Sequence, residues 1–261
     1  FGSRLAGAGD VDGDGYDDVL IGAYGDDDNG STSGSAYVYY GSSAGIDAST
    51  EGKLTASDGV ASDYFGASVE GAGDVDGDGY DDLVIGAYGD DDNGSRSGSA
   101  YVYYGSAAGV DASAEGKLSA SDGEADDYFG FSVAGVGDVD GDGYDDVVIG
   151  AYGDDDNGAT SGSAYVYYGS SAGTDASTES KLNASDGAAS DYFGYGVAGA
   201  GDVDGDGNND LVIGAYGNDD NGSSSGSAYV YSGGCRDEDD DGYCTSEGGL
   251  QRRRRHHSPR G

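Results

Sequence analysis

The sequence is poor in several residue types, and each shortage narrows what the chain can be. It contains no tryptophan, no methionine, one proline, two cysteines and two histidines among 261 residues. The histidines are His256 and His257, so no Ser-His-Asp or Cys-His arrangement can form in the long part of the chain before them. No apolar run reaches about 18 residues, which is the length a membrane-spanning helix needs. We therefore expect neither a triad enzyme nor insertion into a membrane.

Basic residues are also scarce. Eleven lysines and arginines stand against 51 aspartates and glutamates, which gives a formal net charge of -40. Such a charge disfavours binding to nucleic acid or to anionic membrane surfaces. What the chain has instead is glycine, with 54 residues, and this composition favours short strands joined by glycine turns over helices.

A nine-residue acidic motif organises the chain. Residues 10–18 read Asp-Val-Asp-Gly-Asp-Gly-Tyr-Asp-Asp, and the motif returns, with small changes, at 74–82, 138–146 and 202–210, each time 64 residues later. Each copy has carboxylates at positions 1, 3, 5 and 9 and glycine at position 6. Two carboxylates at about 4 Å repel by roughly 4 kcal/mol in a partly screened site, so such a group needs a counter-charge. An all-oxygen donor set suits Ca²⁺, whereas zinc would require Cys or His.

The motif therefore predicts four Ca²⁺ sites, in which the residue after the glycine contributes its main-chain carbonyl. The predicted ligands are Asp10, Asp12, Asp14, Tyr16 and Asp18; Asp74, Asp76, Asp78, Tyr80 and Asp82; Asp138, Asp140, Asp142, Tyr144 and Asp146; and Asp202, Asp204, Asp206, Asn208 and Asp210. An EF-hand is excluded, because its position 12 is a bidentate glutamate and here that position is isoleucine, as in Ile21. The simpler interpretation is an acidic turn that only keeps the surface hydrated, and four identical spacings argue against it.

The 64-residue period predicts the fold class. The units open at Phe1, Phe65, Phe129 and Phe193 and cover 1–64, 65–128, 129–192 and 193–232. In the second unit we expect strands over 65–71, 82–88, 99–104 and 117–120, joined by short links that make them antiparallel. Repeated four-stranded units are typical of an all-β fold, the β-propeller. A calcium-bound parallel β-roll would need a period near nine residues, and no such period is present.

The motifs resemble a known family. Phe1-Gly2, the acidic residues 10–18 and Ile21-Gly22-Ala23 together resemble the FG-GAP repeat of the integrin α-subunit propeller and of related bacterial secreted proteins. The resemblance holds in all four copies, from residue 1 to about 232. One departure recurs, because the proline of the Gly-Ala-Pro motif is replaced by Tyr24, Tyr88, Tyr152 and Tyr216.

The resemblance implies where ligands would bind. Metal loops would brace the blades on one face, and ligands would meet the opposite face, built here from residues 26–33 and 57–64 and their counterparts in the other units. Tyr64, Tyr128 and Tyr192 alternate with acids there and would suit protein or carbohydrate contact. The alternative is that these tyrosines only pack between blades.

The number of blades is unusual for the family, which usually has seven. Because the sequence turns to Gly233-Gly234-Cys235, we expect the fourth blade to lack its fourth strand. Either four blades close into a small ring, or they form an open arc that further blades, partners or self-association complete; we favour the arc. The chain starts on a repeat boundary without methionine or signal peptide, so we expect a mature or excised portion of something longer.

Residues 233–261 form a separate tail. Cys235 and Cys244 predict a disulfide that closes a small acidic loop. Within it, Asp237, Asp239 and Asp241 resemble the start of another Ca²⁺ loop, although position 9 is Thr245. The run 252–257, four arginines and two histidines, would dock on the acidic body, bind a polyanion or be an artefact of cloning or reading frame.

The sequence thus predicts a calcium-stabilised binding or adhesion module, extracellular or on a cell surface, that recognises protein or carbohydrate. The competing hypothesis is a calcium-stiffened spacer of a cell surface or matrix. A glycan-active enzyme is disfavoured, because the paired carboxylates are exposed or committed to metal and no tryptophan is present to stack a sugar.

Overall fold

The computed structural model describes residues 1–46, 48–49, 51–219, 222–223, 225–234 and 251–253. These residues form four antiparallel sheets of four strands, and none of them is helical. The first sheet has β1 (Arg4–Gly9), β2 (Asp18–Ala23), β3 (Ser35–Tyr39) and β4 (Glu51–Leu54). The second has β5 (Ser68–Gly73), β6 (Asp82–Ala87), β7 (Ser99–Tyr103) and β8 (Glu115–Leu118). The third has β9 (Ser132–Gly137), β10 (Asp146–Ala151), β11 (Ser163–Tyr167) and β12 (Glu179–Leu182), and the fourth has β13 (Phe193–Gly201), β14 (Asp210–Ala215), β15 (Ser227–Ser232) and β16 (Gln251–Arg253).

Each sheet follows the strand order of the sequence, which confirms the predicted all-β architecture of four-stranded antiparallel blades. The predicted bounds are close for the second and third strands and less so for the first. In the second sheet, β5 begins at Ser68 rather than at Phe65, because Phe65 pairs with Gly34 of the preceding sheet in an isolated parallel bridge. The opening Phe-Gly pair therefore joins neighbouring blades.

The fourth sheet corrects one expectation. We predicted that it would lack a fourth strand, but β16 from the tail pairs antiparallel with β15, with Val230 opposite Arg253 and Ser232 opposite Gln251. An edge strand leaves a row of backbone donors and acceptors unpaired, so a segment from outside the repeat can complete the sheet with little demand on its sequence.

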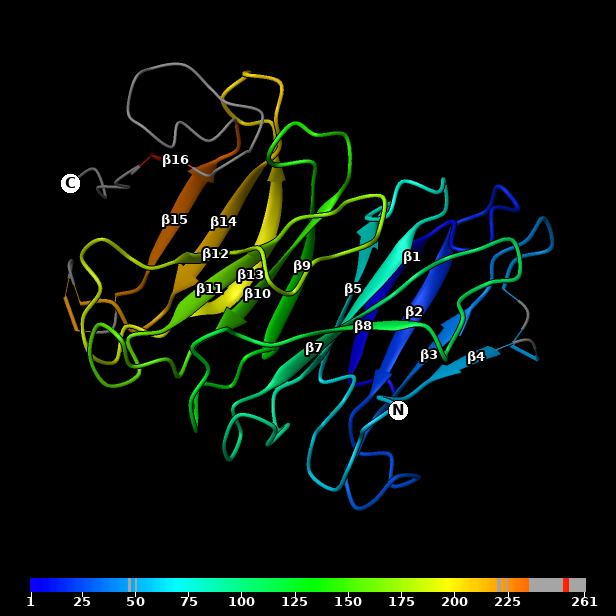
Figure 1. Cartoon of the computed structure of the whole chain (residues 1–261), viewed down its shortest axis with the longest axis horizontal. Coiled ribbons are helices and arrows are strands. Elements are labelled where there is room, and N and C mark those ends of the chain that lie inside the picture. Colours follow the sequence, from blue (N-terminus) through cyan, green and yellow to red (C-terminus); the bar gives the residue numbers. More distant parts are fainter. Residues whose placement is uncertain (47, 50, 220–221, 224, 235–250, 254–261) are drawn as a thin grey trace.

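The four sheets fan out as an open arc (Figure 1). The first strands of successive sheets lie side by side, β1 against β5, β5 against β9 and β9 against β13. No comparable packing joins the first and last sheets among the described strands. Of the two arrangements that the sequence left open, the structure shows the arc.

The core lies between the blades rather than within them, since a single sheet cannot bury both of its faces. Three apolar clusters fill the three junctions between successive sheets. At the first junction, Phe65 is fully buried, and its ring packs edge-on against Tyr101 and Tyr103 at centroid distances of 5.4 and 6.1 Å. This geometry favours aromatic pairs beyond the area they bury. Packing between neighbours therefore holds the arc together.

Candidate metal centres

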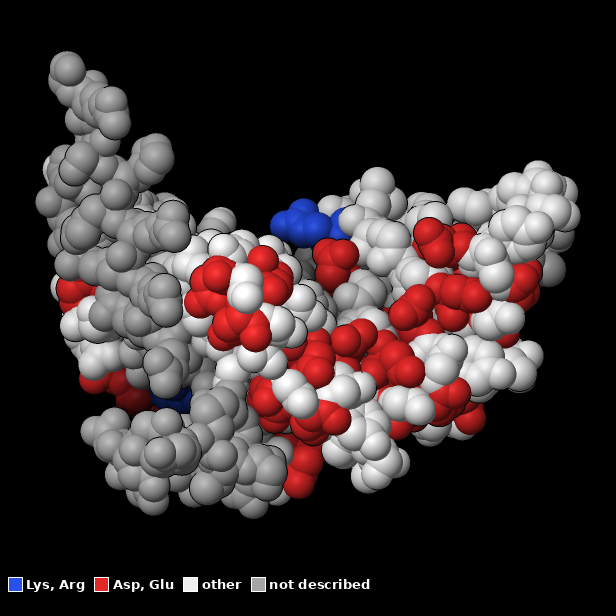
Figure 2. All heavy atoms as spheres, turned by 90° about the horizontal axis from the view of Figure 1, so that it is seen from above, with Lys and Arg blue, Asp and Glu red and all other residues white. Residues whose placement is uncertain are grey.

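The acidic motifs form the loops between the first and second strands of each sheet. Because all four sheets share one topology, these loops lie at the same end of the blades, the upper end in Figure 1. Figure 2 views the molecule from that side and shows Asp and Glu gathered over it, with few Lys or Arg. The four copies of the sequence motif therefore lie at the same, acidic end of the blades.

Backbone amides hold the loop carboxylates in place. In the second loop, Asp74 accepts hydrogen bonds from the amides of Asp78 and Gly79, both at 3.0 Å. Asp76 accepts from the Asp78 amide at 3.1 Å, and Asp78 accepts from the Tyr80 amide at 3.1 Å. The same contacts recur in the first, third and fourth loops. Backbone amides thus orient the carboxylates at positions 1, 3 and 5 of each loop.

In each loop, three carboxylates each offer an oxygen atom, and these atoms lie within 4.8 Å of one another. The groups are Asp10, Asp12 and Asp18; Asp74, Asp76 and Asp78; Asp138, Asp140 and Asp146; and Asp202, Asp204 and Asp206. In the first three loops, the ion pairs that the described lysines and arginines make reach none of these nine side chains. Such groups could hold a hard divalent cation, which would supply the missing positive charge. The carbonyl ligands at Tyr16, Tyr80, Tyr144 and Asn208 stay predictions.

The aspartate at position 9 has a structural task as well. Asp82 is fully buried, and its two oxygens accept hydrogen bonds from the amides of Val75 and Gly105, each at 2.8 Å. It thereby ties the loop to the end of the third strand. Burial raises the pKa of Asp82 to about 7 and that of its counterpart Asp146 to about 8. A cation beside these carboxylates would favour their ionised form.

One contact at this face was not predicted from the sequence. Asp81 reaches back to the preceding loop, where its carboxylate accepts a hydrogen bond from the Asp10 amide at 2.7 Å. Asp145 makes the same contact with the Asp74 amide at 3.0 Å. Gly9 must be glycine here, because its φ is +74° and an added Cβ would lie 2.1 Å from the Asp81 carboxylate. The sequence signal for this contact was the recurrent Asp-Asp pair at the end of the motif. In the second unit, Asp82 bonds to its own loop and Asp81 bonds to the preceding loop.

A fifth acidic group lies at the opposite end of the blades and is already neutralised. Oxygen atoms of Asp58, Asp90 and Asp92 also lie within 4.8 Å of one another. The Lys117 ammonium contacts them at 2.6, 3.0 and 2.6 Å, and the Tyr101 hydroxyl lies 2.8 Å from an Asp58 oxygen and 3.1 Å from an Asp90 oxygen, where it shares its one hydrogen. Burial alone would lower the pKa of Lys117, but its hydrogen bonds to the three aspartates outweigh burial and raise it. We call such a lysine with its acidic partners a lysine clamp.

The lysine clamp repeats along the arc. Lys181 binds Asp122, Asp154 and Asp156, each at 2.7 Å, and Lys53 binds Asp26 and Asp28. Sequence reasoning missed it, although a signal existed: these are the only three lysines of the chain, and all stand at the same position of the repeat. The loop 26–33, which we had placed on the ligand face, is therefore partly held by an internal cation.

The predicted tyrosines form a continuous row at this same end. Tyr64 stacks on Tyr88 with centroids 5.1 Å apart and planes 13° apart, and it meets Tyr24 edge-on at 6.2 Å. Tyr128 stacks on Tyr152 and Tyr192 stacks on Tyr216 in the same way, at 5.0 and 4.9 Å. Tyr64, Tyr128 and Tyr192 have φ values of +57°, +56° and +55°, which are uncommon for residues other than glycine. We call the series Tyr24, Tyr64, Tyr88, Tyr128, Tyr152, Tyr192 and Tyr216 the tyrosine row.

The sequence left two interpretations of these tyrosines open, ligand contact and packing between blades, and the tyrosine row has features of both. Tyr64, Tyr128 and Tyr192 are half-buried between neighbouring blades, as packing residues would be, whereas Tyr24 and Tyr216 are exposed. The positive φ of Tyr64 is held by its amide, which donates to the Thr32 carbonyl at 3.1 Å. The result is a rigid, partly exposed aromatic surface.

Some predictions fall outside the described residues. These are the disulfide between Cys235 and Cys244, the acidic loop with Asp237, Asp239, Asp241 and Thr245, and the basic residues Arg254, Arg255, His256 and His257. Among the described residues, no helix is long and apolar enough to cross a membrane.

The stacked four-stranded sheets and their acidic loops define a propeller-type repeat protein with candidate cation sites. Family models of the FG-GAP repeat match residues 1–39, 49–103, 113–167 and 176–231. The chain therefore belongs to the FG-GAP repeat family.

Comparison with curated proteins finds integrin α subunits. The chain is 35% identical to integrin alpha-4 of Xenopus laevis over 156 residues, which is 58% of this chain and 14% of that protein. It is 34% identical to integrin alpha-6 of Gallus gallus over 152 residues, 56% of this chain and 13% of that protein. With integrin alpha-V of Gallus gallus it shares 41% over 96 residues, 35% of this chain and 9% of that protein. The chain thus spans only a small part of the length of these relatives.

Proposed function

We propose that this chain is a calcium-stabilised, extracellular or cell-surface binding module. The observation that carries the calcium part is the contrast between the two acidic ends of the blades. The lysine clamps carry their own counter-charge, whereas the carboxylates of the first three loops are bonded to backbone amides and make no ion pair with a lysine or arginine among the described residues. Aspartate oxygens together with main-chain carbonyls are the donors that Ca²⁺ prefers.

Each ion would be held by the aspartates at positions 1, 3, 5 and 9 and by the carbonyl at position 7. When bound, Ca²⁺ supplies positive charge and no redox chemistry. The chain's own residues do the rest: backbone amides orient the carboxylates, and Asp82 and its counterparts attach each loop to the third strand. We expect affinities of roughly 10⁻⁴ to 10⁻³ M per loop, as in extracellular modules.

Titration calorimetry tests the metal assignment directly. Four ions per chain are expected from the loops of residues 1–232, and magnesium should compete poorly, because it demands a tighter octahedral geometry. A triple variant, Asp10→Asn with Asp12→Asn and Asp14→Asn, should remove one ion. The matched triple variant of a lysine clamp, Asp58→Asn with Asp90→Asn and Asp92→Asn, should remove none. A chain that binds no ion contradicts the assignment.

The binding part of the proposal is supported by the tyrosine row. Because the backbone already holds the stacked rings in place, their side chains would lose little conformational entropy when a ligand binds. The row lies beside the acidic clamp loops, at the end of the blades away from the loops proposed to hold calcium. Aromatic rings with hydroxyl tips next to carboxylates suit a carbohydrate or a protein surface with basic residues.

A glycan and extracellular-protein array in calcium buffer would test this role. Once a ligand is found, Tyr24→Ser and Tyr216→Ser should weaken binding by about tenfold or more, as loss of an aromatic anchor does elsewhere. Tyr16→Ser is the matched control, since Tyr16 is also exposed but lies at the opposite end. If no saturable ligand appears, the spacer hypothesis replaces the binding module and calcium keeps its structural role.

A further inference from the structure

Among the residues that the structure describes, no sheet covers the two outer faces of the arc, although the corresponding faces of the inner sheets are buried. On the leading face, which belongs to the first sheet, Phe1 is 74% and Leu5 is 68% exposed. Their counterparts in the second sheet, Phe65 and Val69, are 0% and 4% exposed because the first sheet covers them. The leading face therefore carries the side chains of an internal junction without the neighbour that such a junction contains.

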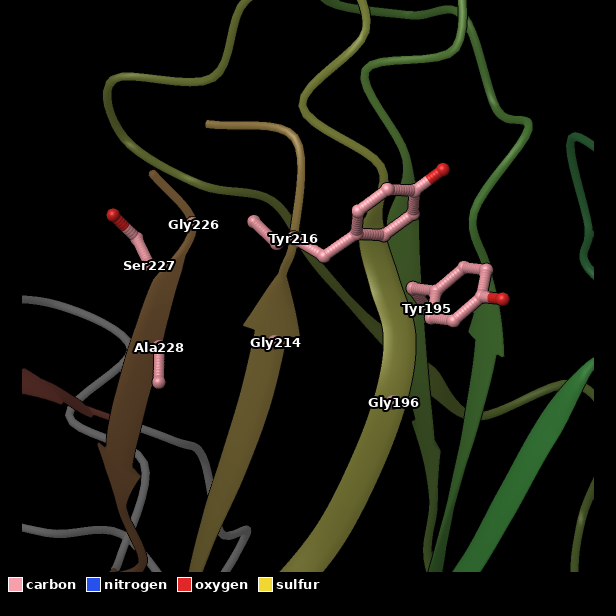
Figure 3. Close-up of a pocket in the computed structure, with 8 residues that line it drawn as sticks. Tyr195, Gly196, Gly214, Tyr216, Gly226, Ser227 and Ala228 are labelled. Carbon is pink, nitrogen blue, oxygen red and sulfur yellow. The ribbon is translucent and has the colours of Figure 1, made fainter. Parts of the chain in front are cut away.

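The trailing face, which belongs to the fourth sheet, has a pocket of about 460 Å³. Figure 3 shows Gly214 on β14 and Gly226 directly before the neighbouring strand β15, with the rings of Tyr195 and Tyr216 beside them. Ala228 also lines the pocket and is exposed, whereas its counterparts Ala36, Ala100 and Ala164 are fully buried.

The internal junctions show what such a pocket accommodates. At the first junction, Gly34 forms a bridge with Phe65, and a Cβ added at Gly34 would lie 2.1 Å from the Phe65 carbonyl oxygen. A Cβ added at Gly22 would lie 2.2 Å from the Gly66 carbonyl oxygen. The second and third junctions repeat both close approaches, to Phe129-Gly130 and to Phe193-Gly194. These positions require glycine, because the backbone of a Phe-Gly pair lies where a side chain would begin.

Gly214 and Gly226 are the fourth members of these two glycine series, and no described atom lies closer than 3.4 Å to a Cβ added at either. The nearest atom to a Cβ added at Gly214 is the Gly196 carbonyl oxygen at 3.6 Å, and at Gly226 it is the Tyr216 carbonyl oxygen at 3.4 Å. Gly2 has a φ of +76°, close to the +80° of Gly66 at the first junction. Gly2 therefore already has a φ close to that of its counterpart in an internal junction.

We propose that the pocket at Gly214 and Gly226 docks the Phe1-Gly2 edge of a second copy of this chain. The contact is head to tail, so each copy uses one face for the copy before it and the other face for the copy after it. A polar contact accompanies it at the acidic loops. Asp17 of the incoming copy corresponds to Asp81 and would accept a hydrogen bond from the Asp202 amide, as Asp81 does from the Asp10 amide at 2.7 Å.

Sedimentation velocity over a range of protein concentrations tests the proposal, in calcium buffer at physiological ionic strength. The wild-type chain should associate as its concentration rises. Gly214→Val should weaken association by about tenfold or more, because its side chain occupies the place of the Gly2 carbonyl. Leu5→Asp should do the same from the leading face. Val60→Asp is the matched control, an exposed apolar residue between the first two sheets.

Mixing the two variants makes the test specific for a head-to-tail contact. Leu5→Asp leaves the trailing face intact and Gly214→Val leaves the leading face intact, so the mixture should form a 1:1 dimer that does not grow further. Should Gly214→Val lower the melting temperature, Ala228→Glu blocks the same pocket from an exposed position. A wild-type chain that stays monomeric, or association that survives both variants, overturns the proposal. The calcium and ligand assignments do not depend on this result.

Discussion

Groups of aspartates lie at both ends of the arc's blades, and their negative charge is compensated in different ways. In the loop of Asp74, Asp76 and Asp78, and in the clamp of Asp58, Asp90 and Asp92, three aspartates bring oxygen atoms within 4.8 Å of one another. In the clamp, an ammonium group and a tyrosine hydroxyl bond to the carboxylates. In the loop, the partners are backbone amides. A group of acids is thus ambiguous by itself, and its partners decide what it can bind.

The two ends also differ in whether their contribution to stability depends on the calcium concentration. A clamp contains its own lysine, so its contribution to stability does not depend on the calcium concentration. A loop depends on an ion from outside, so its contribution varies with the concentration of that ion. Because each clamp with three acids takes one of them from the preceding unit, as Lys117 does from Asp58, the blades stay coupled even where the loops are empty.

Removal of calcium should have the largest effect. With Ca²⁺ at ten to a hundred times the expected dissociation constant, each loop contributes about 1.4 to 2.7 kcal/mol, or about 6 to 11 kcal/mol for four loops. Calorimetric melting with calcium and with chelator measures this difference. Sodium chloride at matched ionic strength is the control, since general screening also relieves a net charge of -40. If sodium chloride alone restores the full melting temperature, the loops do not differ from the rest of the acidic surface.

Lys117→Met should have the next largest effect, because it converts a clamp into an uncompensated acidic group. Asp90 is buried, so we expect a loss of about 3 kcal/mol in chelator, as when a buried ion pair loses one partner. Calcium should restore part of this loss, because Asp58, Asp90 and Asp92 already have the spacing of a cation site. Lys53→Met is the matched control, because Lys53 has two acidic partners instead of three. This variant should lose less stability in chelator, and calcium should restore less of it. Equal behaviour of the two variants would show that the third acid does not matter.

Asp76→Asn should have a smaller effect that depends on calcium. In calcium it should cost about 2 kcal/mol, the contribution of one occupied loop. In chelator the variant should be as stable as the wild type or more stable, because a like charge is removed while the side-chain oxygen can still accept the Asp78 amide. Asp92→Asn, in the clamp, should instead cost less than about 1 kcal/mol in both solutions, because that pair is largely exposed. Denaturant titrations in the two solutions measure both variants.

The fold was predictable because the same local sequence patterns recur in every unit. A period of 64 residues, the Phe-Gly openings and the apolar runs such as 82–88 are all local patterns, and β6 and β7 lie where these patterns placed them. The loops were predictable for the same reason, since a nine-residue motif brings its own carboxylates together.

What the sequence could not show depends on contacts between units. Lys117 and Asp58 are 59 residues apart and belong to different repeats, so no local pattern links them. The strand β16 has no strand pattern of its own, and only the free edge of β15 explains its place. The stacking of Tyr64 on Tyr88 likewise requires the path of the chain between blades.

A third kind of acid, buried with neither a calcium loop nor a lysine of its own, extends the comparison and gives the smallest effect. Asp63 is 2% exposed and accepts a hydrogen bond from the Val60 amide at 2.6 Å. Burial raises its pKa from 3.8 to about 6, and the charges of Asp90, Asp58 and Asp91 add to the shift. Its contribution to stability is therefore complete below about pH 4 and is lost as the pH rises through about 6.

Asp63→Asn should remove that pH dependence, because the amide accepts the same hydrogen bond without a charge. We expect the variant to match the wild type near pH 4 and to be more stable by about 1 kcal/mol above pH 6, after the weaker bond to Val60 is allowed for. Denaturant unfolding across this range in saturating calcium measures the difference while the loops stay occupied. Asp111→Asn is the exposed control and should gain nothing, since hydrogen bonds from Ser113 lower the pKa of Asp111. A constant difference between Asp63→Asn and the wild type at all pH values would mean that Asp63 is ionised throughout, and that its surroundings already supply the counter-charge which we assign only to the clamps and to calcium.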